Sequence, residues 1–322
     1  MLNFNQFRIF YHVAKRLNYT RAAADLYISQ PAVTAQMKAF EEYCGFKVFK
    51  KKDRKIWLTD EGKALFEYAS TIFGLEKDIE GIIEDMRELK RGVLRIGTTK
   101  AYARYFMPLM LSIFHGKFPD IKIELNEGSS HDMALSLLEF KNEVAVIAKT
   151  ADIEGIRYIP FSQEEMVLIT SPDHPFTQQD AIDASMLADV PFIMKDRGSG
   201  TRRLVDDLFQ RIGCEPNIQM EVSNTEFIKE LVSRGDGVSL LVRDTVAAEI
   251  AQAKLAAVPI KGEDLYLEVS ICYLADQHLS PSARAFVTTL EQLRSGREFT
   301  PQGIGEYMAR ISAQHRKRKP DK

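Results

Sequence analysis

The chain has 322 residues, enough for two or three domains, and its 45% hydrophobic and 27% charged residues are typical of a globular protein. The sequence contains no run of about 18 apolar residues that could span a membrane, and its start lacks the basic-then-apolar order of a secretory signal. We therefore expect a cytoplasmic protein without membrane contact. The formal net charge of −2 conceals eleven Lys/Arg against four Asp/Glu in residues 1–58, an excess that indicates a nucleic-acid-binding surface at this end.

Three helices are predicted in the first 43 residues. Apolar residues between positions 4 and 17 recur at helical spacing and predict a supporting helix. Thr20 is a candidate N-cap for the second helix and Ser29 for the third, and Pro31 lies in the first turn of the third, where its missing N–H costs nothing. Alanines permit close crossing of the last two helices and leave polar residues facing outward, as a helix-turn-helix requires. The alternative is a helical hairpin that binds no DNA.

A basic hairpin is predicted after these helices. Residues 46–49 and 55–58 are predicted strands on either side of a run of charged residues. Three helices and a hairpin make a winged helix-turn-helix domain over residues 1–59. Its wing residues Lys52 and Arg54 are expected at phosphates or in the narrow minor groove.

A long helix is predicted over residues 60–91, with Thr59 as its candidate N-cap. Apolar residues then alternate at spacings of three and four for more than three heptads, which predicts a linker helix that pairs with a second copy. The predicted dimerisation residues are Leu65, Tyr68, Ile72, Leu75, Ile79, Ile82 and Met86. The alternative is one long helix buried on its own protein.

The pattern changes to alternating strands and helices from residue 92 to residue 296. Such alternation predicts open, mostly parallel α/β sheets, and the length suits two lobes with a cleft between them. Lobe I is predicted at about 92–162 and 267–296, and lobe II at about 163–266. Ligands of such folds bind at the carboxyl ends of strands, against helix N-termini.

Three expectations concern local structure in this part of the chain. Residues 102–118 are predicted to form one helix, and residues 156–160 and 166–169 two separate strands. A basic C-terminal tail is predicted at 297–322, with one short helix at 304–311.

Four loops of the two-lobed body place hydroxyl or amide groups directly before a predicted helix. Each loop alone would serve as an ordinary N-cap, but several converging on the cleft would bind a carboxylate, a phosphate or a sulfur oxyanion. Lys100 and Arg202 are candidates for the positive charge, so we expect a small anionic effector and no cofactor. The predicted effector contacts are Thr98, Thr99, Lys100, Ser129, Ser130, Ser199, Gly200, Thr201, Asn224 and Thr225.

No metal site and no catalytic site are expected. The three cysteines and six histidines lack ligand spacing, and such thiols suit a reducing compartment. The segment around Ser199 lacks the G-x-S-x-G elbow, and no Gly-rich dinucleotide fingerprint follows a strand. A non-enzymatic DNA-binding regulator is therefore favoured. The alternative is a two-lobed solute-binding protein without a transcriptional role, which the basic module and the missing signal disfavour.

Two stretches of sequence match a known family. The first consists of Thr20-Arg21-Ala22-Ala23, Ser29-Gln30-Pro31-Ala32-Val33-Thr34, Gln36, Lys38, Glu41, Gly45, Phe49, Arg54, Leu58-Thr59 and Gly62. With these residues, the chain from about 2 to 295 resembles a LysR-type transcriptional regulator. The second, KDRGSGTRR at 195–203, is similar to the R-E-P-G-S-G-T-R signature of the branch that regulates carbon fixation and sulfite reduction, although Lys195, Asp196 and Arg197 depart from it.

The resemblance implies a multi-domain α/β fold: a winged helix-turn-helix, a long linker helix and a two-lobed effector-binding domain that resembles periplasmic binding proteins. It implies a bacterial, cytoplasmic homodimer or homotetramer that binds double-stranded promoter DNA and a small-molecule effector, and it admits RNA polymerase as a partner. We expect the effector to change the angle between the lobes and hence the packing of dimers.

The resemblance also assigns DNA contacts by position. Together with the outward polar residues and the wing, the predicted DNA contacts are Thr20, Ser29, Gln30, Pro31, Thr34, Gln36, Lys38, Lys52 and Arg54. Members of the family commonly have Arg where this chain has Ala35, so its target sequence need not follow the usual half-site.

Overall fold

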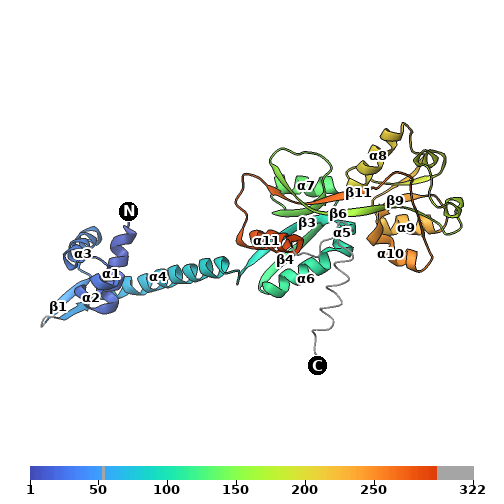
Figure 1. Cartoon of the computed structure of the whole chain (residues 1–322). Coiled ribbons are helices and arrows are strands. Elements are labelled where there is room, and N and C mark those ends of the chain that lie inside the picture. Colours follow the sequence, from blue (N-terminus) through green and yellow to red (C-terminus); the bar gives the residue numbers. More distant parts are fainter. Residues whose placement is uncertain (53–54, 296–322) are drawn as a thin grey trace, which may run out of the picture. The chain divides into compact units, whose positions relative to one another are not determined.

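The computed structural model describes residues 1–52 and 55–295, and the chain divides into two compact units, Met1–Asp85 and Met86–Lys322 (Figure 1). Each unit has its own hydrophobic core. Arg54, the side chain of Lys52 and the tail with its expected helix at 304–311 lie outside the described residues. Within the described ranges, no helix combines the length and the hydropathy that a membrane span needs.

The first unit contains three short helices, a two-stranded antiparallel hairpin and most of a long helix. Its elements are α1 (Phe4–Arg16), α2 (Tyr19–Asp25), α3 (Gln30–Cys44), β1 (Phe49–Lys52), β2 (Lys55–Leu58) and α4 (Asp60–Arg87). The predicted wing hairpin is confirmed, but its first strand begins at Phe49 and not at residue 46. Residues 46–48 are held against α3 instead, because the Glu41 carboxylate accepts a hydrogen bond from Val48 N at 3.1 Å.

Side-chain caps fix the ends of α2 and α3. Ser29 caps α3 as predicted, since its Oγ accepts a hydrogen bond from Ala32 N at 3.3 Å. The cap of α2 is Asn18, whose Oδ1 accepts from Arg21 N at 2.9 Å, whereas Thr20 lies in the first turn of the helix. The prediction for Thr20 was wrong because Asn and Thr are both strong N-caps and stand two positions apart.

The core of the first unit is aromatic. Phe10 of α1 packs against Phe40 of α3 with ring centroids 5.3 Å apart, and Phe7 packs against Phe73 of α4 at 6.0 Å. Such aromatic pairs contribute about 0.5–1.5 kcal/mol each beyond the area that they bury. The first half of α4 is therefore part of the helix-turn-helix module and not only a linker.

The predicted dimer seam on α4 divides into two groups. Thr59 caps the helix, since its Oγ1 accepts a hydrogen bond from Gly62 N at 2.9 Å. Leu65 and Ile72 are half-buried against the core of their own unit, and Ile82 is also half-buried. The exposed members of the seam are Tyr68, Leu75, Ile79 and Met86. One part of the apolar stripe is thus used within the chain, and the other part is available to a second helix.

The second unit is built on a seven-stranded mixed sheet. Its strands are β3 (Gly92–Thr99), β4 (Ile121–Gly128), β5 (Val144–Ala148), β6 (Ile156–Thr170), β9 (Ser239–Val242), β10 (Ala256–Val258) and β11 (Tyr266–Leu274), in the order β10-β6-β11-β5-β3-β4 with β9 on β6. β7 (Phe192–Lys195) and β8 (Ile218–Val222) form a separate parallel pair. In the large sheet only β3 pairs in parallel, with β4 and β5, so the prediction of mostly parallel sheets is wrong there.

The helices of this unit are α5 (Lys100–Tyr105), α6 (Met107–Lys117), α7 (Ser130–Leu138), α8 (Gly200–Ile212), α9 (Thr225–Ser233), α10 (Arg243–Ala251) and α11 (Pro281–Ser295), with 3-10 turns at η1 (Pro175–Gln178) and η2 (Ala184–Asp189). The single helix expected at 102–118 is broken at Phe106 into α5 and α6. The break follows from Pro108, which has no N–H to donate to Arg104 O and so cannot continue a helix from α5.

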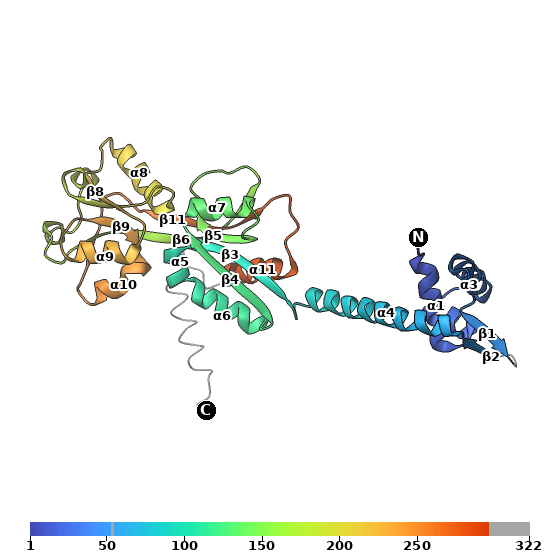
Figure 2. The ribbon, with the colours of Figure 1, turned by 180° about the vertical axis from the view of Figure 1, so that it is seen from behind.

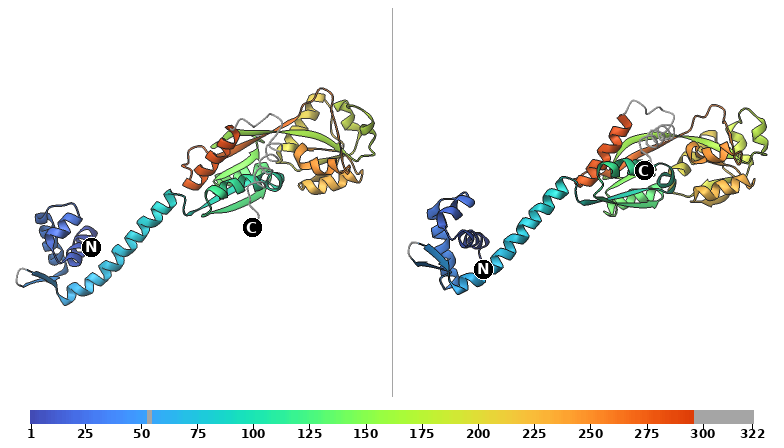
Figure 3. Two further views of the ribbon diagram at one scale, coloured as in Figure 1. Left: turned by 60° about the horizontal axis from the view of Figure 1, so that its bottom comes forward. Right: turned by 90° about the horizontal axis from the view of Figure 1, so that it is seen from below.

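β6 is one continuous strand of 15 residues, where two strands were predicted. Its first part pairs with β11, from Ile156↔Leu274 to Glu165↔Tyr266, and its last part pairs with β9 and β10. Figure 3 shows β6, in yellow-green, continuing from one lobe into the other. Four polar residues at 162–165 concealed the strand in the sequence. The lobe boundaries predicted at 162–163 and 266–267 fall inside β6 and β11, so these two antiparallel strands join the lobes.

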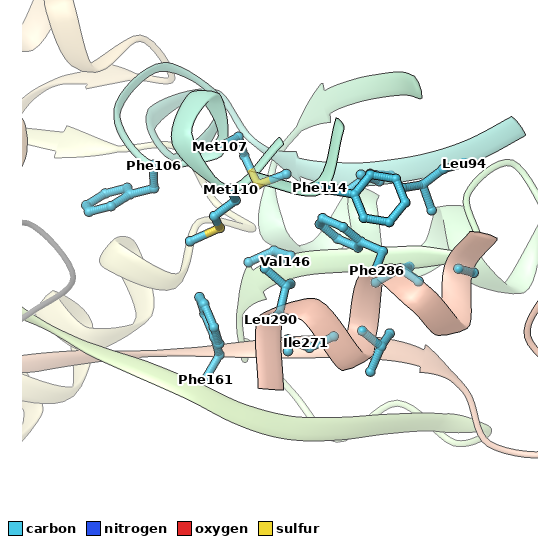
Figure 4. Packing of buried hydrophobic residues seen from close by; sticks show 14 of the residues in the cluster. Leu94, Phe106, Met107, Met110, Phe114, Val146, Phe161, Ile271, Phe286 and Leu290 are labelled. Carbon is cyan, nitrogen blue, oxygen red and sulfur yellow. The ribbon is translucent and has the colours of Figure 1, made fainter. Parts of the chain in front are cut away.

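Helices cover both faces of the sheet in each lobe. In lobe I, α6 and α11 pack on one face and α7 on the other (Figures 1 and 2). The cluster under α6 and α11 includes Phe114 and Phe286, with ring centroids 5.5 Å apart (Figure 4). Lobe II repeats the arrangement, with α8 on one face and α9 and α10 on the other.

Candidate functional site

A cavity of about 310 Å³ lies between the two lobes of the second unit. The N-terminal ends of five helices contribute to it: α5 and α7 from lobe I, and α8, α9 and α10 from lobe II. Of the ten predicted effector contacts, the structure brings eight together here: Thr99, Lys100, Ser129, Ser130, Ser199, Gly200, Thr201 and Thr225. The four predicted loops therefore do converge on one cleft.

The other two predicted contacts serve the fold. Thr98 is fully buried, and its Oγ1 donates a hydrogen bond to Val146 O at 2.8 Å inside the sheet. Asn224 caps α9, since its Oδ1 accepts from Glu226 N at 2.9 Å. Both side chains therefore have structural roles, Thr98 within the sheet and Asn224 as a helix cap.

The N-terminus of α8 differs from those of α7 and α9. Ser129 caps α7 in a reciprocal capping box, whereas the side chain of Ser199 makes no capping hydrogen bond to α8. The first N–H groups of a helix have no intrahelical partner, and they carry the positive end of the helix dipole. Because Ser199, Gly200 and Thr201 all line the cavity, this uncapped end of α8 opens onto it.

Gly200 sets how close α8 comes to lobe I. A Cβ atom built on Gly200 would lie 2.3 Å from the Cβ of Ala148 on β5, closer than real Cβ atoms approach. Only glycine therefore lets the N-terminus of α8 reach this wall of the cavity. Gly198 marks a second close approach, since its carbonyl oxygen accepts a hydrogen bond from His131 N at 3.1 Å across the lobes.

Two lysines contribute positive charge to the cavity. Burial lowers the pKa of Lys195, with a further lowering by Lys100 that Asp196 opposes. The Lys195 ammonium donates to the Ser223 carbonyl oxygen and lies 3.5 Å from Thr225 Oγ1. Lys100 is exposed at the start of α5.

The cavity is mixed in charge as a whole. Glu127, Asp132 and Asp196 also line it, although the Asp132 carboxylate accepts hydrogen bonds from Ser129 Oγ at 2.7 Å and from Ser129 N at 3.4 Å. An anion would consequently be favoured beside the α8 N-terminus and Lys195, and not by the overall charge of the cavity. The apolar part of the lining includes Phe106, Leu267 and Val269.

A second group of charged residues bridges the lobes beside this cavity. Tyr105 of α5 donates to Glu226 Oε1 of α9 at 2.6 Å and accepts from the Lys229 ammonium at 2.7 Å. Lys229, only 4% exposed, also donates to Thr245 O at 3.0 Å and to Glu249 Oε1 at 2.9 Å. We call Tyr105, Glu226, Lys229 and Glu249 the inter-lobe bridge.

Hydrogen bonds within the bridge shift the pKa of two of its residues, Lys229 and Glu226. Burial acts to lower the pKa of Lys229, but hydrogen bonds to Tyr105, Glu249 and Glu226 outweigh it and raise the pKa above its usual value. Burial likewise acts to raise the pKa of Glu226, and hydrogen bonds from Tyr105 and Lys229 lower it instead. Because α5 and α9 line the cavity at their N-termini, both helices connect the bridge to the candidate effector site.

The predicted DNA-binding residues on α3 are all exposed in the first unit, as is Thr20. Thr34 Oγ1 accepts a hydrogen bond from Gln30 Nε2 at 2.8 Å, and Gln36 Oε1 accepts from Gln6 Nε2 of α1 at 3.2 Å. Side chains oriented in this way suit contacts with base edges or phosphates in a major groove. The helix that carries them is separated from the wing only by residues 45–48.

Two family models together cover most of the chain. Residues 4–63 match the bacterial regulatory helix-turn-helix protein, lysR family, and residues 87–294 match the LysR substrate binding domain. The chain belongs to the LysR family. The predicted recognition is thereby confirmed, and with it the architecture of a helix-turn-helix domain and a two-lobed α/β effector-binding domain in a transcriptional regulator.

Relatives and a solved structure agree with this assignment. The LysR regulator is 30% identical to the HTH-type transcriptional activator CmpR of Synechocystis sp. over 89% of this chain and 94% of that protein. It is 29% identical to the RuBisCO operon transcriptional regulator of Acidithiobacillus ferrooxidans, over 89% and 92%. The CcmR regulatory domain of Synechocystis PCC6803, solved in complex with 2-PG, is 26% identical with a TM-score of 0.60, over 64% of this chain and 99% of that one. The carbon-fixation branch suggested by residues 195–203 is confirmed.

The charged residues at 195–203 play different parts in this LysR regulator from those expected. Arg202 was a candidate for the positive charge of the site, but its guanidinium donates to Asp206 at 2.9 Å and to Glu221 at 3.0 Å and does not line the cavity. Lys195, which was noted only as a departure from the branch signature, lines the cavity instead. Its position at the end of a buried strand is the sequence signal that could have identified it.

Among the described residues of this LysR regulator, no group of three or more His, Cys, Asp or Glu side chains is arranged to hold a metal ion. Tyr102, which lines the cavity, donates its hydroxyl to Glu164 Oε1 at 2.7 Å, and burial raises its pKa well above the usual value. This hydroxyl is therefore already committed to a structural hydrogen bond.

Proposed function

We propose that this LysR regulator binds double-stranded promoter DNA as a homodimer or a dimer of dimers, and that it acts without catalysis. The exposed polar face of α3, the basic wing and the exposed apolar residues of α4 support this proposal. A basic surface supplies the sequence-independent part of binding, and side chains in the major groove supply the specificity.

The regulating ligand is a small anion bound between the lobes. The observation that carries this proposal is the uncapped N-terminus of α8, which opens onto a cavity that Lys195 also lines. An anion there would accept hydrogen bonds from backbone N–H groups and interact favourably with the helix dipole. The 2-PG bound to the CcmR regulatory domain supports an anionic ligand for a relative of the same fold.

Ligand binding regulates DNA binding through the relative position of the lobes. The cavity is lined by residues of both lobes, so a bound anion contacts both and favours one arrangement of β6 and β11. A ligand can change this equilibrium only through different affinities for the two arrangements, typically about 1–3 kcal/mol of coupling.

The test uses the full-length protein. A duplex is first selected from a random pool, and its binding is followed by fluorescence anisotropy with and without 2-PG, phosphorylated sugars, dicarboxylates and sulfate. The thermal unfolding temperature is measured for the same set. We expect at least one small anion to raise the unfolding temperature and to change the affinity for the duplex. No DNA binding would contradict the regulator, and no anion effect on either readout would contradict the anionic ligand.

Replacing Lys195 then locates the site. Lys195→Met is expected to weaken binding of that anion at least tenfold, because hydrogen bonds to charged groups contribute about 1.5–3 kcal/mol. Lys254→Met is the matched control, since Lys254 is exposed in the same unit and does not line the cavity. Equal ligand affinity in the two variants would place the anion elsewhere.

A further inference from the structure

The turn before α3 is unusually exposed. All six residues from Tyr27 to Ala32 are exposed, and Tyr27 is 96% exposed, more than any other aromatic residue that the structure describes. Within the described residues, the Tyr27 side chain takes part in no hydrogen bond or ring contact. An exposed apolar residue is ordinary by itself. Tyr27 is informative because it combines this exposure with an unusual backbone conformation and a position directly before the N-cap region of α3.

Tyr27 lies in the left-handed region of backbone conformation, with φ at +54°. Its N–H donates to Ala24 O at 3.2 Å, and the next N–H donates to Ala23 O at 3.0 Å, so the turn is closed by the backbone alone. Gly or Asn adopts this conformation at lower cost than an aromatic residue. The protein thus keeps a strained tyrosine whose side chain adds nothing to the fold of its own unit, and such strain is characteristic of functional positions.

The surroundings of Tyr27 suit a nucleic-acid backbone. The residue stands two positions before Ser29, the N-cap of α3, and the exposed Gln30 and Pro31 follow at the start of that helix. Asp25, the nearest acidic residue in the sequence, has its carboxylate engaged by Arg16 through hydrogen bonds of 2.6 and 3.1 Å. An adjacent phosphate would therefore meet a paired carboxylate and not a free one.

We infer that Tyr27 is a DNA-backbone contact, its ring lying against a sugar and its hydroxyl donating a hydrogen bond to a phosphate. The inference rests on the proposed DNA-binding function and adds a residue to it. A neutral hydroxyl releases no counterion and reads no base. The contact consequently contributes equally to the affinity for every DNA sequence and leaves the salt dependence of binding unchanged.

The experiment compares full-length Tyr27→Asn and Tyr27→Phe with the wild type. Dissociation constants are measured for the selected duplex and for a mixed-sequence duplex at several salt concentrations, together with the unfolding temperature. Tyr27→Asn should unfold at the same or a higher temperature, because Asn tolerates the positive φ, and yet bind both duplexes about three- to tenfold more weakly, as expected for one lost hydrogen bond. The salt slope should not change. Tyr27→Phe, which retains the ring, should lose part of that affinity.

A matched control exists in the second unit. Phe140 is also an exposed aromatic residue, at 68%, with φ at +56°. Phe140→Asn should relieve the same kind of strain without weakening the binding of either duplex. Wild-type affinity in both Tyr27 variants would overturn this inference but not the proposed function. A loss of affinity confined to the selected duplex would also overturn it, because such a loss would indicate base reading or a protein partner. Failure of the wild-type protein to bind either duplex would overturn the proposed function and the inference with it.

Discussion

Single residues decide which of the predicted positions can take part in ligand binding. Thr98, Thr99 and Arg202 all stand beside predicted helix starts, but Thr99 alone lines the cavity. Thr98 points into the sheet because successive residues of a strand face opposite sides. One partner of Arg202 could be predicted from the sequence, since Asp206 follows it by four residues, the spacing of an ion pair on one helix face. Its second partner, Glu221, comes from β8, and no local pattern reveals such a contact.

Gly200 gives a prediction at this scale. Gly200→Ala must separate the start of α8 from β5, because the new methyl group would lie 2.3 Å from the Ala148 Cβ. Overpacking of this kind costs about 1–3 kcal/mol, so the unfolding temperature should fall and the response to anions should be lost. Thermal unfolding with and without the anion measures both effects.

Gly116 is the matched control for this substitution. It lies within α6, and a Cβ added there meets nothing within 4 Å. Gly116→Ala should stabilise the protein by about 0.5–1 kcal/mol and leave the anion response intact. If Gly200→Ala behaved like Gly116→Ala, the close packing of α8 on β5 would not be needed for ligand binding.

Secondary-structure elements were predicted best where the signal is local. The heptad pattern predicted one long helix over residues 60–91, and α4 spans Asp60–Arg87. The pattern could not say which side of α4 the protein uses for itself, because Leu65 and Ile72 read as seam residues and yet contact the module core. β6 was missed as one strand because its middle is polar. The buried Glu164 lies in this middle part and accepts hydrogen bonds from Tyr102 at 2.7 Å and from Ser162 at 2.6 Å.

The division of α4 makes its two groups of residues separable by mutation. Ile79 is 56% exposed within the chain, so Ile79→Asp should dissociate the dimer with little effect on the folding of its own unit, since only a helix pair would bury the new charge. Ile72→Asp should instead lower the unfolding temperature, because the charge is placed against the core. Light scattering after size exclusion and circular dichroism melts at one protein concentration distinguish the two outcomes.

Lys77→Asp is the control, as an exposed change of charge two residues from Ile79 on the same helix. It should alter neither the molecular mass nor the melting temperature by much. A protein that remained dimeric with Ile79→Asp would exclude α4 as the dimer seam. A stable monomer from Ile72→Asp would mean that Ile72 serves the partner and not the core.

At the scale of the whole molecule, the inter-lobe bridge and the cavity share two helices. α5 begins with the cavity residues Thr99 and Lys100 and ends with Tyr105, and α9 begins with the cavity residue Thr225 and carries Glu226 and Lys229 in its first two turns. We therefore expect a ligand at the start of these helices and the hydrogen bonds along them to favour the same arrangement of the lobes. Two sites that bias one equilibrium are coupled, and the coupling is reciprocal.

The pH dependence of this coupling has a definite sign. The pKa of Glu226 is lowered in the bridged arrangement, so its contribution is complete above the ordinary carboxyl pKa and is lost as pH falls through the lowered value. The pKa of Lys229 is raised, so its contribution is complete below the ordinary ammonium pKa and is lost as pH rises through the raised value. Between these limits the bridge should be fully formed, and anion affinity should be flat across neutral pH as far as the bridge determines it.

Lys229→Met tests the bridge directly. Removing the ammonium leaves the Glu226 and Glu249 carboxylates without their shared cation, so the bridged arrangement should lose population and the anion should bind about 5- to 150-fold more weakly. The affinity for DNA without the anion should change in the direction opposite to the anion's own effect, because the two equilibria are linked. Tyr105→Phe, which keeps every charge and removes one hydroxyl, should give a smaller change of the same sign.

Arg234→Met is the control, since Arg234 is an exposed cation at the other end of α9 and pairs only with Glu230 among the described residues. If Lys229→Met left anion affinity and DNA affinity as they are in the Arg234→Met protein, the bridge would stabilise the lobes without taking part in regulation.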